Sequence, residues 1–264
     1  MSTAASGPPP TIPGVYNDLL EGRDNTAAER DLADQLLKLL PRLRKAALAN
    51  ARFIRRAVDV VAGHGVAQFI DLGCGLPTPD AASVLEVVSR HHEDTKVVYV
   101  DIDPKVAVHC RALLRSPGRS LMLEDDAREV DVVLGHAAQL LDLSKPVGLI
   151  AAALLHFWQD DAQPGEVLQR YARALAPGSY LVLTHACGDK LRPADLAAAV
   201  AAYSRTQSPI YPRSAEAIKG LLAGMDVLDP GLVEASQWRP DDLPEEVGDA
   251  QFLAAVARLD GEGR

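Results

Sequence analysis

The stretch Phe69-Ile-Asp-Leu-Gly-Cys-Gly-Leu-Pro77 decides the fold of this chain. An apolar run typical of a short strand ends at Leu72, and Gly73 and Gly75 follow it directly. An open α/β sheet binds its ligands at the carboxyl ends of its strands, where glycine lets backbone and ligand approach closely. The pattern therefore predicts a ligand-binding loop between the first strand of a sheet and the helix after it.

On both sides of this loop the chain alternates between apolar strands and amphipathic helices. The expected strands are 68–72, 96–100, 120–123, 148–155 and 180–184, and the helices between them are 81–90, 104–114 and 165–175. Helices over 26–40 and 41–62 come before the sheet, and 194–203 and 214–223 follow it. Extended segments at 226–228 and 232–238 precede a closing strand at 252–258, with little room for a crossover helix. The fold class is therefore α/β, with a mostly parallel sheet and an antiparallel last strand.

The composition is that of an acidic globular protein. The chain has 264 residues, and 27 Lys and Arg against 36 Asp and Glu give a net charge of −9. A domain that binds nucleic acid usually carries a basic stripe. One basic cluster lies among helical Ala and Leu and is interpreted as a solvated helix face: Arg42, Arg44, Lys45, Arg52, Arg55 and Arg56. We therefore expect no nucleic-acid partner.

The cysteines and the N-terminus bear on compartment. Three scattered cysteines without a C-x-x-C pair predict neither a disulfide framework nor a metal site. Residues 1–13 lack the charged and apolar segments of a signal peptide, and no run is long enough to span a bilayer. We expect a cytoplasmic protein without a membrane partner, as a monomer or homodimer.

Two details of the loop indicate its ligand. Asp71 comes just before Gly73-Cys-Gly75, and Leu76-Pro77-Thr78 replaces the third glycine of the dinucleotide fingerprint. A carboxylate repels a pyrophosphate but attracts the ammonium and sulfonium of S-adenosylmethionine (SAM). The electrostatics therefore favour SAM over NAD, with Asp71, Gly73, Gly75 and Pro77 in the cofactor site. A tight turn after a strand is the simpler alternative.

An acidic residue also ends the second strand. Asp101 can accept hydrogen bonds from both ribose hydroxyls, as acids at this position do in nucleotide-binding α/β folds. Asp103 stands directly before Pro104 and is the better helix cap, which leaves Asp101 for the ligand. Ile102 lies between these acids and is expected to line the same site.

Three adjacent acids follow the third strand. Asp126 is a candidate acceptor for the adenine amino group, Asp125 is a close competitor, and Glu124 is the third choice. A solvated loop is the alternative interpretation of this run.

Candidate catalytic residues follow the fourth and fifth strands. His156 is a candidate general base, because imidazole titrates near neutrality, or it lines the cofactor pocket through its backbone. His185 has a similar position, and a structural role is the alternative for both. The N-terminal helices and the segment 204–213 are expected to wall an aromatic, partly basic acceptor pocket with Tyr203, Tyr211 and Arg213. The Arg213 guanidinium suits a carboxylate or phenolate.

Further blocks of sequence occur in order along the chain. They are Tyr16-Asn-Asp-Leu-Leu-Glu-Gly22, Asp24-Asn25, Ala28-Glu-Arg-Asp31, Arg52-Phe-Ile-Arg-Arg-Ala57, Val98-Tyr-Val-Asp-Ile-Asp-Pro104, Leu155-His-Phe157, Ala176-Pro-Gly-Ser-Tyr-Leu-Val-Leu-Thr-His185 and Trp238-Arg-Pro240. Together with the loop, they resemble the actinobacterial SAM-dependent methyltransferase family formerly known as a domain of unknown function. The resemblance spans about 15–258 and implies the class I, Rossmann-like methyltransferase fold, with seven strands, six of them parallel.

The resemblance also implies that the helical N-terminus folds over the cofactor cleft. Tyr16, Gly22 and Asn25 are then expected to touch SAM or wall off the site, with helix capping and packing as the alternative. The chain departs from the family pattern at Glu21, where glycine is common, and at Thr26, where an aromatic residue is common.

These expectations divide the chain into a disordered arm over 1–14, a helical lid over 15–65 and a SAM-binding domain over 66–264. The function expected is methyl transfer from SAM to a small-molecule acceptor, most simply on oxygen or nitrogen, in specialised metabolism. Two alternatives keep SAM: a SAM-fold enzyme with other chemistry, and a non-catalytic protein that binds SAM or S-adenosylhomocysteine (SAH). A dinucleotide oxidoreductase is the rival at the level of the fold.

Overall fold

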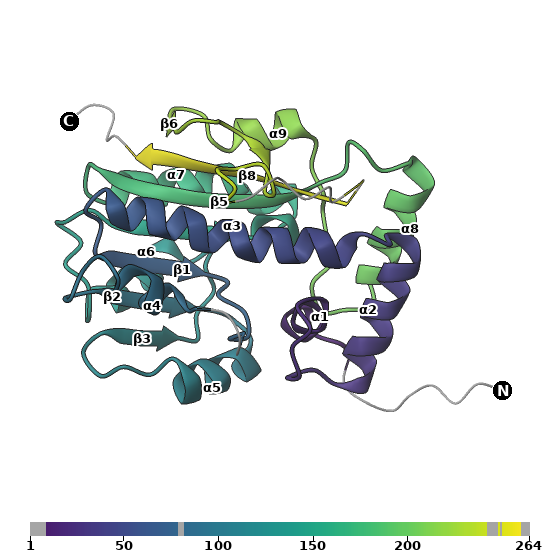
Figure 1. Ribbon diagram of the computed structural model, residues 1–264, viewed down its shortest axis with the longest axis horizontal. Coiled ribbons are helices and arrows are strands. Elements are labelled where there is room, and N and C mark those ends of the chain that lie inside the picture. The colour runs from purple at the N-terminus through teal and green to yellow at the C-terminus, as the bar shows by residue number, and fades with distance from the viewer. Residues whose placement is uncertain (1–8, 79–81, 242–247, 249, 260–264) are drawn as a thin grey trace.

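The computed structural model describes residues 9–78, 82–241, 248 and 250–259, which form three layers with helices on both faces of a sheet (Figure 1). The helices are α1 (Ile12–Leu19), α2 (Ala27–Leu39), α3 (Leu43–Gly63), α4 (Val84–Val88), α5 (Pro104–Leu113), α6 (Val130–Ala137), α7 (Pro164–Ala174), α8 (Pro193–Tyr203) and α9 (Ala215–Gly220). The strands are β1 (Gln68–Leu72), β2 (Lys96–Val100), β3 (Ser120–Leu123), β4 (Gly148–Ala152), β5 (Ser179–Cys187), β6 (Asp226–Val227), β7 (Val233–Glu234) and β8 (Gln251–Leu259). Two 3-10 helices, η1 (Leu155–Phe157) and η2 (Asp160–Ala162), follow β4. The α/β class expected from the sequence is confirmed.

The topology of the sheet sets the place of a ligand. The strand order is β3-β2-β1-β4-β5-β8-β6, with β7 also paired to β8, and β1 to β5 are mutually parallel. The order reverses between β1 and β4, so their carboxyl ends flank the switch point where open sheets bind ligands. In Figure 1 the arrowheads of β1, β2 and β3 point toward the end of the molecule that holds α1, α2 and α8.

The last strands complete the expected pattern. β8 runs antiparallel to β5 along its nine residues. β6 and β7 are two-residue segments that both pair antiparallel with β8, so they run in the direction of β5. The turn Asp229-Pro-Gly231 separates them, as predicted. Counted as one interrupted strand, they give the seven-stranded, six-parallel sheet of class I methyltransferases.

Side chains alternate between the two faces of the sheet because successive residues of a strand point to opposite sides. In β2, Val97 and Tyr99 pack with α3 on one face, whereas Val98 and Val100 join the core under α6 and α7 on the other. Phe53 and Val61 place α3 lengthwise against the first face. The carboxyl-terminal half of the predicted lid, which is α3, therefore packs against one face of the sheet and forms one of the helical layers.

Two helices escaped the sequence analysis. The arm was expected to extend over 1–14, but α1 begins at Ile12, so its boundary at residue 14 is wrong. Residues 1–8 lie outside the described part. Thr11 caps α1 by accepting the Gly14 N–H, and proline is tolerated in the first turn. Gly14 is a poor helix former, but the Glu29 carboxyl fills the place of its missing side chain, so packing decides its conformation. The other helix is α6, whose short sequence carried no recognisable period.

Candidate functional site

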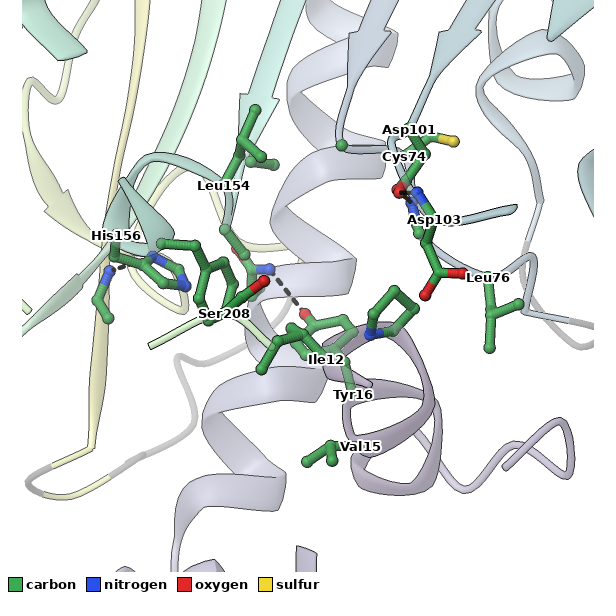
Figure 2. A pocket seen from close by; sticks show the side chains of 18 of the residues that line it. Ile12, Val15, Tyr16, Cys74, Leu76, Asp101, Asp103, Leu154, His156 and Ser208 are labelled. Atoms are coloured by element: carbon green, nitrogen blue, oxygen red, sulfur yellow. Dashed lines mark hydrogen bonds between the residues drawn. The ribbon is translucent and has the colours of Figure 1, made fainter. Parts of the chain in front are cut away.

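A cavity of about 1420 Å³ lies at the carboxyl ends of β1, β2 and β4 and extends between α1, α3 and α8. The predicted site residues that line it are Tyr16, Asp71, Gly73, Gly75, Pro77, Asp101, Ile102, Asp125, Asp126, His156 and Tyr211. Figure 2 shows Asp101 and Cys74 on one side, His156 on the opposite side, and Ile12 and Tyr16 of α1 between them. A pocket for one small molecule measures ~300–1,000 Å³. The cavity therefore has room for two ligands.

The glycine loop has the geometry that its sequence predicts. Gly73 and Gly75 have φ angles of 64° and 66°, which favour glycine over other residues. A side chain at Gly73 would also meet Leu154, whose Cδ1 lies 2.7 Å from the position of the added Cβ. The loop is therefore fixed by backbone conformation and by contact with the segment after β4.

Asp101 is buried and holds the loop in place. Its Oδ2 accepts the Gly75 N–H at 3.0 Å, and its Oδ1 accepts the Asp103 N–H at 2.9 Å. Asp103 caps α5 by accepting the Lys105 N–H, as expected from the proline that follows it. Asp101 is therefore not wholly free for a ligand, although each oxygen keeps one lone pair and the side chain lines the cavity.

Asp71 is half-buried beside the loop, and none of the described residues supplies a cation that affects its pKa. Burial, followed by the negative charge of Asp101, raises the pKa of Asp71 from its ordinary 3.8 to about 7. Burial likewise raises the pKa of Asp101. Two carboxyls of raised pKa at one edge of the sheet form a site that a cation would stabilise.

The acids after β3 differ in their partners. Both carboxyl oxygens of Asp126 accept from the Arg128 guanidinium, and these bonds outweigh burial and lower the pKa of Asp126. Asp125 Oδ2 lies 2.7 Å from His136 Nδ1. This is its one side-chain hydrogen bond within the described part of the chain. Ile102, 64% exposed, lies on the same wall of the cavity. The hydrogen bonds therefore favour Asp125 over Asp126 as the acid available to a ligand.

Among the N-terminal residues, Tyr16 lines the cavity and the other two candidates do not. Asn25 donates to Gly22 O and to Asn17 Oδ1, which ties the turn between α1 and α2. A side chain at Gly22 would collide with Asn17. Gly22 and Asn25 therefore have the capping and packing role that was their alternative, and the expected contact with the cofactor site is corrected.

His156 is buried at the start of the segment after β4. Its Nδ1 accepts the N–H of Ala186 at 3.2 Å, and burial, with the charges of His185 and Arg213, holds its pKa well below the ordinary value. A backbone N–H only donates, so the neutral ring carries its proton on Nε2. His156 therefore presents a donor and not a base, and the expected role as general base is corrected.

Arg213 does not reach the cavity. Its guanidinium donates to Leu155 O, Trp158 O and Asp160 Oδ1 and contacts His185 Nε2 at 2.9 Å. All of its donor groups serve the fold of the chain after β4, so the expected contact with an acceptor is wrong. Tyr211 does line the cavity, and its backbone N–H donates to His156 O at 2.6 Å.

Comparison with protein families assigns nearly the whole chain. Residues 5–260 match the S-adenosyl methyltransferase family. The chain belongs to this family. A candidate methyltransferase from Thermobifida fusca is 34% identical, with a TM-score of 0.87 and 95% of each chain covered. A DUF574 family protein from Streptomyces avermitilis is 26% identical, with a TM-score of 0.87 over 95% of this chain and 97% of its own.

No curated protein sequence matches this methyltransferase significantly. The family establishes SAM as the cofactor and the class of reaction. None of the described helices is long and apolar enough to cross a bilayer. Within the same described residues, no cluster of His, Cys, Asp and Glu is arranged to hold a metal ion.

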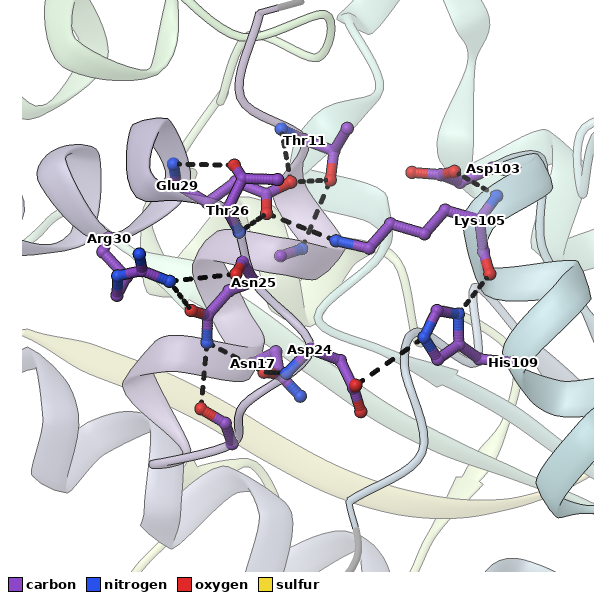
Figure 3. Close-up of polar contacts among 12 residues, drawn as sticks. Thr11, Asn17, Asp24, Asn25, Thr26, Glu29, Arg30, Asp103, Lys105 and His109 are labelled. Atoms are coloured by element: carbon purple, nitrogen blue, oxygen red, sulfur yellow. Dashed lines mark hydrogen bonds and ion pairs between the residues drawn. The ribbon is translucent and has the colours of Figure 1, made fainter.

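Figure 3 shows the polar contacts that join the N-terminal helices of the methyltransferase to α5. Glu29 is 2% exposed and accepts from Thr11, from the Thr26 N–H and, at 3.3 Å, from Lys105 Nζ. Burial would raise the pKa of Glu29, but these bonds and the Lys105 charge outweigh it and lower the pKa. In a second contact, His109 Nε2 on α5 lies 3.7 Å from Oδ1 of Asp24, in the turn between α1 and α2. We call these two contacts the latch.

Sequence reasoning missed several residues of the cavity wall. Asn50 is fully buried on α3, where a polar residue on an otherwise apolar face was the available signal. Arg55 was assigned to a solvated face, yet it is half-buried and lines the cavity. Ala153 has a φ of 51° next to Leu154, and such strain at a site has no signature in the sequence.

Proposed function

We propose that the protein transfers the methyl group of SAM to a small-molecule acceptor of specialised metabolism, on oxygen or nitrogen. The observation that carries this proposal is the single cavity that joins the carboxyl ends of the strands to the space between α1, α3 and α8. At about 1420 Å³ it can hold cofactor and acceptor side by side. A macromolecular substrate would instead need an open groove and, for nucleic acid, a basic surface, and the net charge is −9.

The part of the cavity at the carboxyl ends of β1 and β2 carries charges opposite to those of SAM. We propose that Asp71 attracts the ammonium group, because no cation among the described residues contributes to the pKa of this half-buried carboxyl. Arg55 makes no ion pair within the described residues, and burial, then the charge of Arg52, lowers its pKa. A carboxylate beside Arg55 would stabilise its buried positive charge, so we propose that Arg55 binds the carboxylate of the methionine moiety.

The nucleoside end is assigned in the same way. We propose that Asp101 accepts from the ribose hydroxyls with its remaining lone pairs, while the loop amides hold it in position. Exposed Ile102 would cover one face of the adenine ring, and Asp125 would accept from its amino group. Each assignment uses a group that lines the cavity and has bonding capacity left.

When bound, SAM supplies a methyl group already activated by its sulfonium. The protein then has to position the reactants and exclude water, and orientation of this kind is worth ~7–11 kcal/mol of a barrier. The loop, Leu154 and the latched N-terminal helices fix the walls of the cavity for this purpose. His156 can contribute an Nε2–H donor to the acceptor. The proton that the acceptor loses on methylation passes to solvent.

The test measures where a labelled methyl group goes. The purified protein is incubated with trideuteromethyl-SAM and a cell extract, and the low-mass, protein and nucleic-acid fractions are analysed separately by mass spectrometry. We expect the label in a low-mass compound, and label only in protein or nucleic acid would overturn the proposal. Gly73→Val is the inactive control, because its side chain collides with Leu154. Calorimetry with SAH and with NADH, run in parallel, tests the cofactor.

A further inference from the structure

The part of the cavity distant from the glycine loop is walled by aromatic rings. The ring of Phe157 lies 4.4 Å from that of His156 and 6.2 Å from that of Tyr203, and Phe252 lies 5.9 Å from His156, between centroids. Tyr16 of α1 joins them, and all five side chains line the same cavity. We call this part the aromatic chamber. Flat aromatic rings fit such walls well, because offset and edge contacts between rings are favourable.

The aromatic chamber carries no ionised wall residue near neutral pH. Burial raises the pKa of Tyr16 to about 12 and also raises that of Tyr203, and it keeps His156 neutral. Arg213, the cation expected here, is engaged elsewhere. Arg55, five residues after Asn50 on α3, is close enough for its charge to lower the pKa of Tyr16 slightly against the effect of burial, and the proposed function assigns it to the cofactor carboxylate. An acceptor buried here without a charge of its own avoids an uncompensated desolvation penalty.

One polar atom in this wall has no partner. The Ala47 carbonyl can only accept, so the Tyr16 hydroxyl donates its proton to it, at 3.2 Å. The Tyr16 oxygen must then accept, which brings the Asn50 Nδ2 toward it at 2.7 Å. This chain of bonds leaves Asn50 Oδ1 buried and unpaired among the described residues, on the lining of the cavity. A buried carbonyl without a donor is costly, and native proteins seldom retain one without a use.

We propose that the acceptor is an uncharged aromatic compound, and that a phenol O–H or aromatic N–H of this compound donates to Asn50 Oδ1 while its ring lies in the aromatic chamber. Because this proposal names the substrate class of the same site, it rests on the proposed function. Asn50 acts as a positioning residue, since an amide oxygen cannot take up the proton. The contact orients the ring, and Tyr16 fixes which face of the amide is presented.

The test uses three probes of one ring system: 2-naphthol, 2-methoxynaphthalene and naphthalene-2-carboxylate. Their dissociation constants are measured by calorimetry or ligand-observed NMR on protein saturated with SAH. We expect 2-naphthol to bind at least tenfold more tightly than the methyl ether, which lacks the donor, and more tightly than the carboxylate. A site built to hydrogen-bond a hydroxyl rejects an analogue without one, because its polar group is left unpaired. In Asn50→Leu, the preference for 2-naphthol over its methyl ether should disappear. The SAH affinity should stay within about twofold, which is about 0.4 kcal/mol.

Each outcome decides between the proposal and its rivals. A donor preference that survives in Asn50→Leu overturns the role of Asn50, as does a tenfold loss of SAH affinity, which would assign Asn50 to the cofactor ammonium. Failure of all three probes to bind, or tightest binding of the carboxylate, overturns the neutral aromatic class. If SAH itself does not bind the wild type, the proposed function fails instead. If Asn50→Leu does not fold, Tyr16→Phe is tested in its place. Without the Tyr16 hydroxyl the Asn50 amide can rotate, so the preference for 2-naphthol over its methyl ether should fall.

Discussion

Substitution of Asp71 by Asn should stabilise the ligand-free protein and weaken cofactor binding at the same time. The pKa of Asp71 rises from 3.8 to about 7 on folding, because burial and Asp101 disfavour the carboxylate. Between these two pH values the folded protein retains a proton that the unfolded chain has lost. Stability contributed by this group is therefore greatest in acid and falls as the pH rises toward 7.

The magnitude follows from linkage. Each pKa unit corresponds to ~1.4 kcal/mol, so a pKa displaced from 3.8 to about 7 opposes folding by at most about 4 kcal/mol above pH 7. At pH 5 only about a third of this penalty is present. The gain in unfolding free energy from Asp71→Asn should therefore grow by about 2–3 kcal/mol between pH 5 and pH 8. Asp34→Asn, an exposed change on α2, is the matched control and should show no such trend.

The assay is urea unfolding without ligand at both pH values, followed by calorimetry with SAH and with SAM at pH 8. Loss of a charged hydrogen bond of ~1.5–3 kcal/mol should weaken SAH binding about 10- to 100-fold. SAH lacks the sulfonium, so an equal loss for both ligands would place Asp71 at the ammonium. Reduced stability of the variant at pH 8, or unchanged affinity for both ligands, would refute the reasoning.

Three further changes test individual contacts. Glu21 has a φ of 63°, which favours glycine, so Glu21→Gly should raise the unfolding free energy by about 1 kcal/mol, and a decrease would contradict this. Thr26 caps α2 by accepting the Glu29 N–H, so Thr26→Ala should lower stability by about 1 kcal/mol in chemical denaturation, and no change would mean that the cap contributes nothing. Arg213→Ala should lower stability by about 3 kcal/mol with SAH affinity retained, whereas Arg173→Ala, which breaks an exposed pair, should cost less than about 1 kcal/mol. Equal effects of the two arginine variants on the thermal midpoint would refute the structural role of Arg213.

The sequence predicted the elements whose signals are local. Alternating apolar runs, the Gly73-Cys-Gly75 loop and Pro104 after a capping Asp103 each reflect backbone rules that hold within a few residues. The separation of two extended segments by Asp229-Pro-Gly231 was predicted for the same reason. The positions of Asp71 and Asp101 on the cavity follow from topology, because parallel strands place their carboxyl ends at one edge.

The rest depends on contacts between distant parts of the chain. Arg213 looked available in sequence, but the carbonyls of Leu155 and Trp158, in and directly after the 3-10 helix η1, accept from its guanidinium. The tautomer of His156 is set by an amide thirty residues away on β5, which no spacing rule reveals. Asn50 and Tyr16 become a pair only because α1 folds back onto α3. Such residues acquire their chemistry from packing, so the fold was more predictable than the site.

The latch has a consequence for the order and speed of turnover. Glu29–Lys105 and Asp24–His109 join the N-terminal segment to α5 (Figure 3), and Ile12 of α1 and Pro104 of α5 both line the cavity. Separation of the N-terminal helices from α5 would break the contact between the charged groups of Glu29 and Lys105. The residence time of SAH should therefore shorten as ionic strength rises, and product release is the step of the catalytic cycle that the latch would slow.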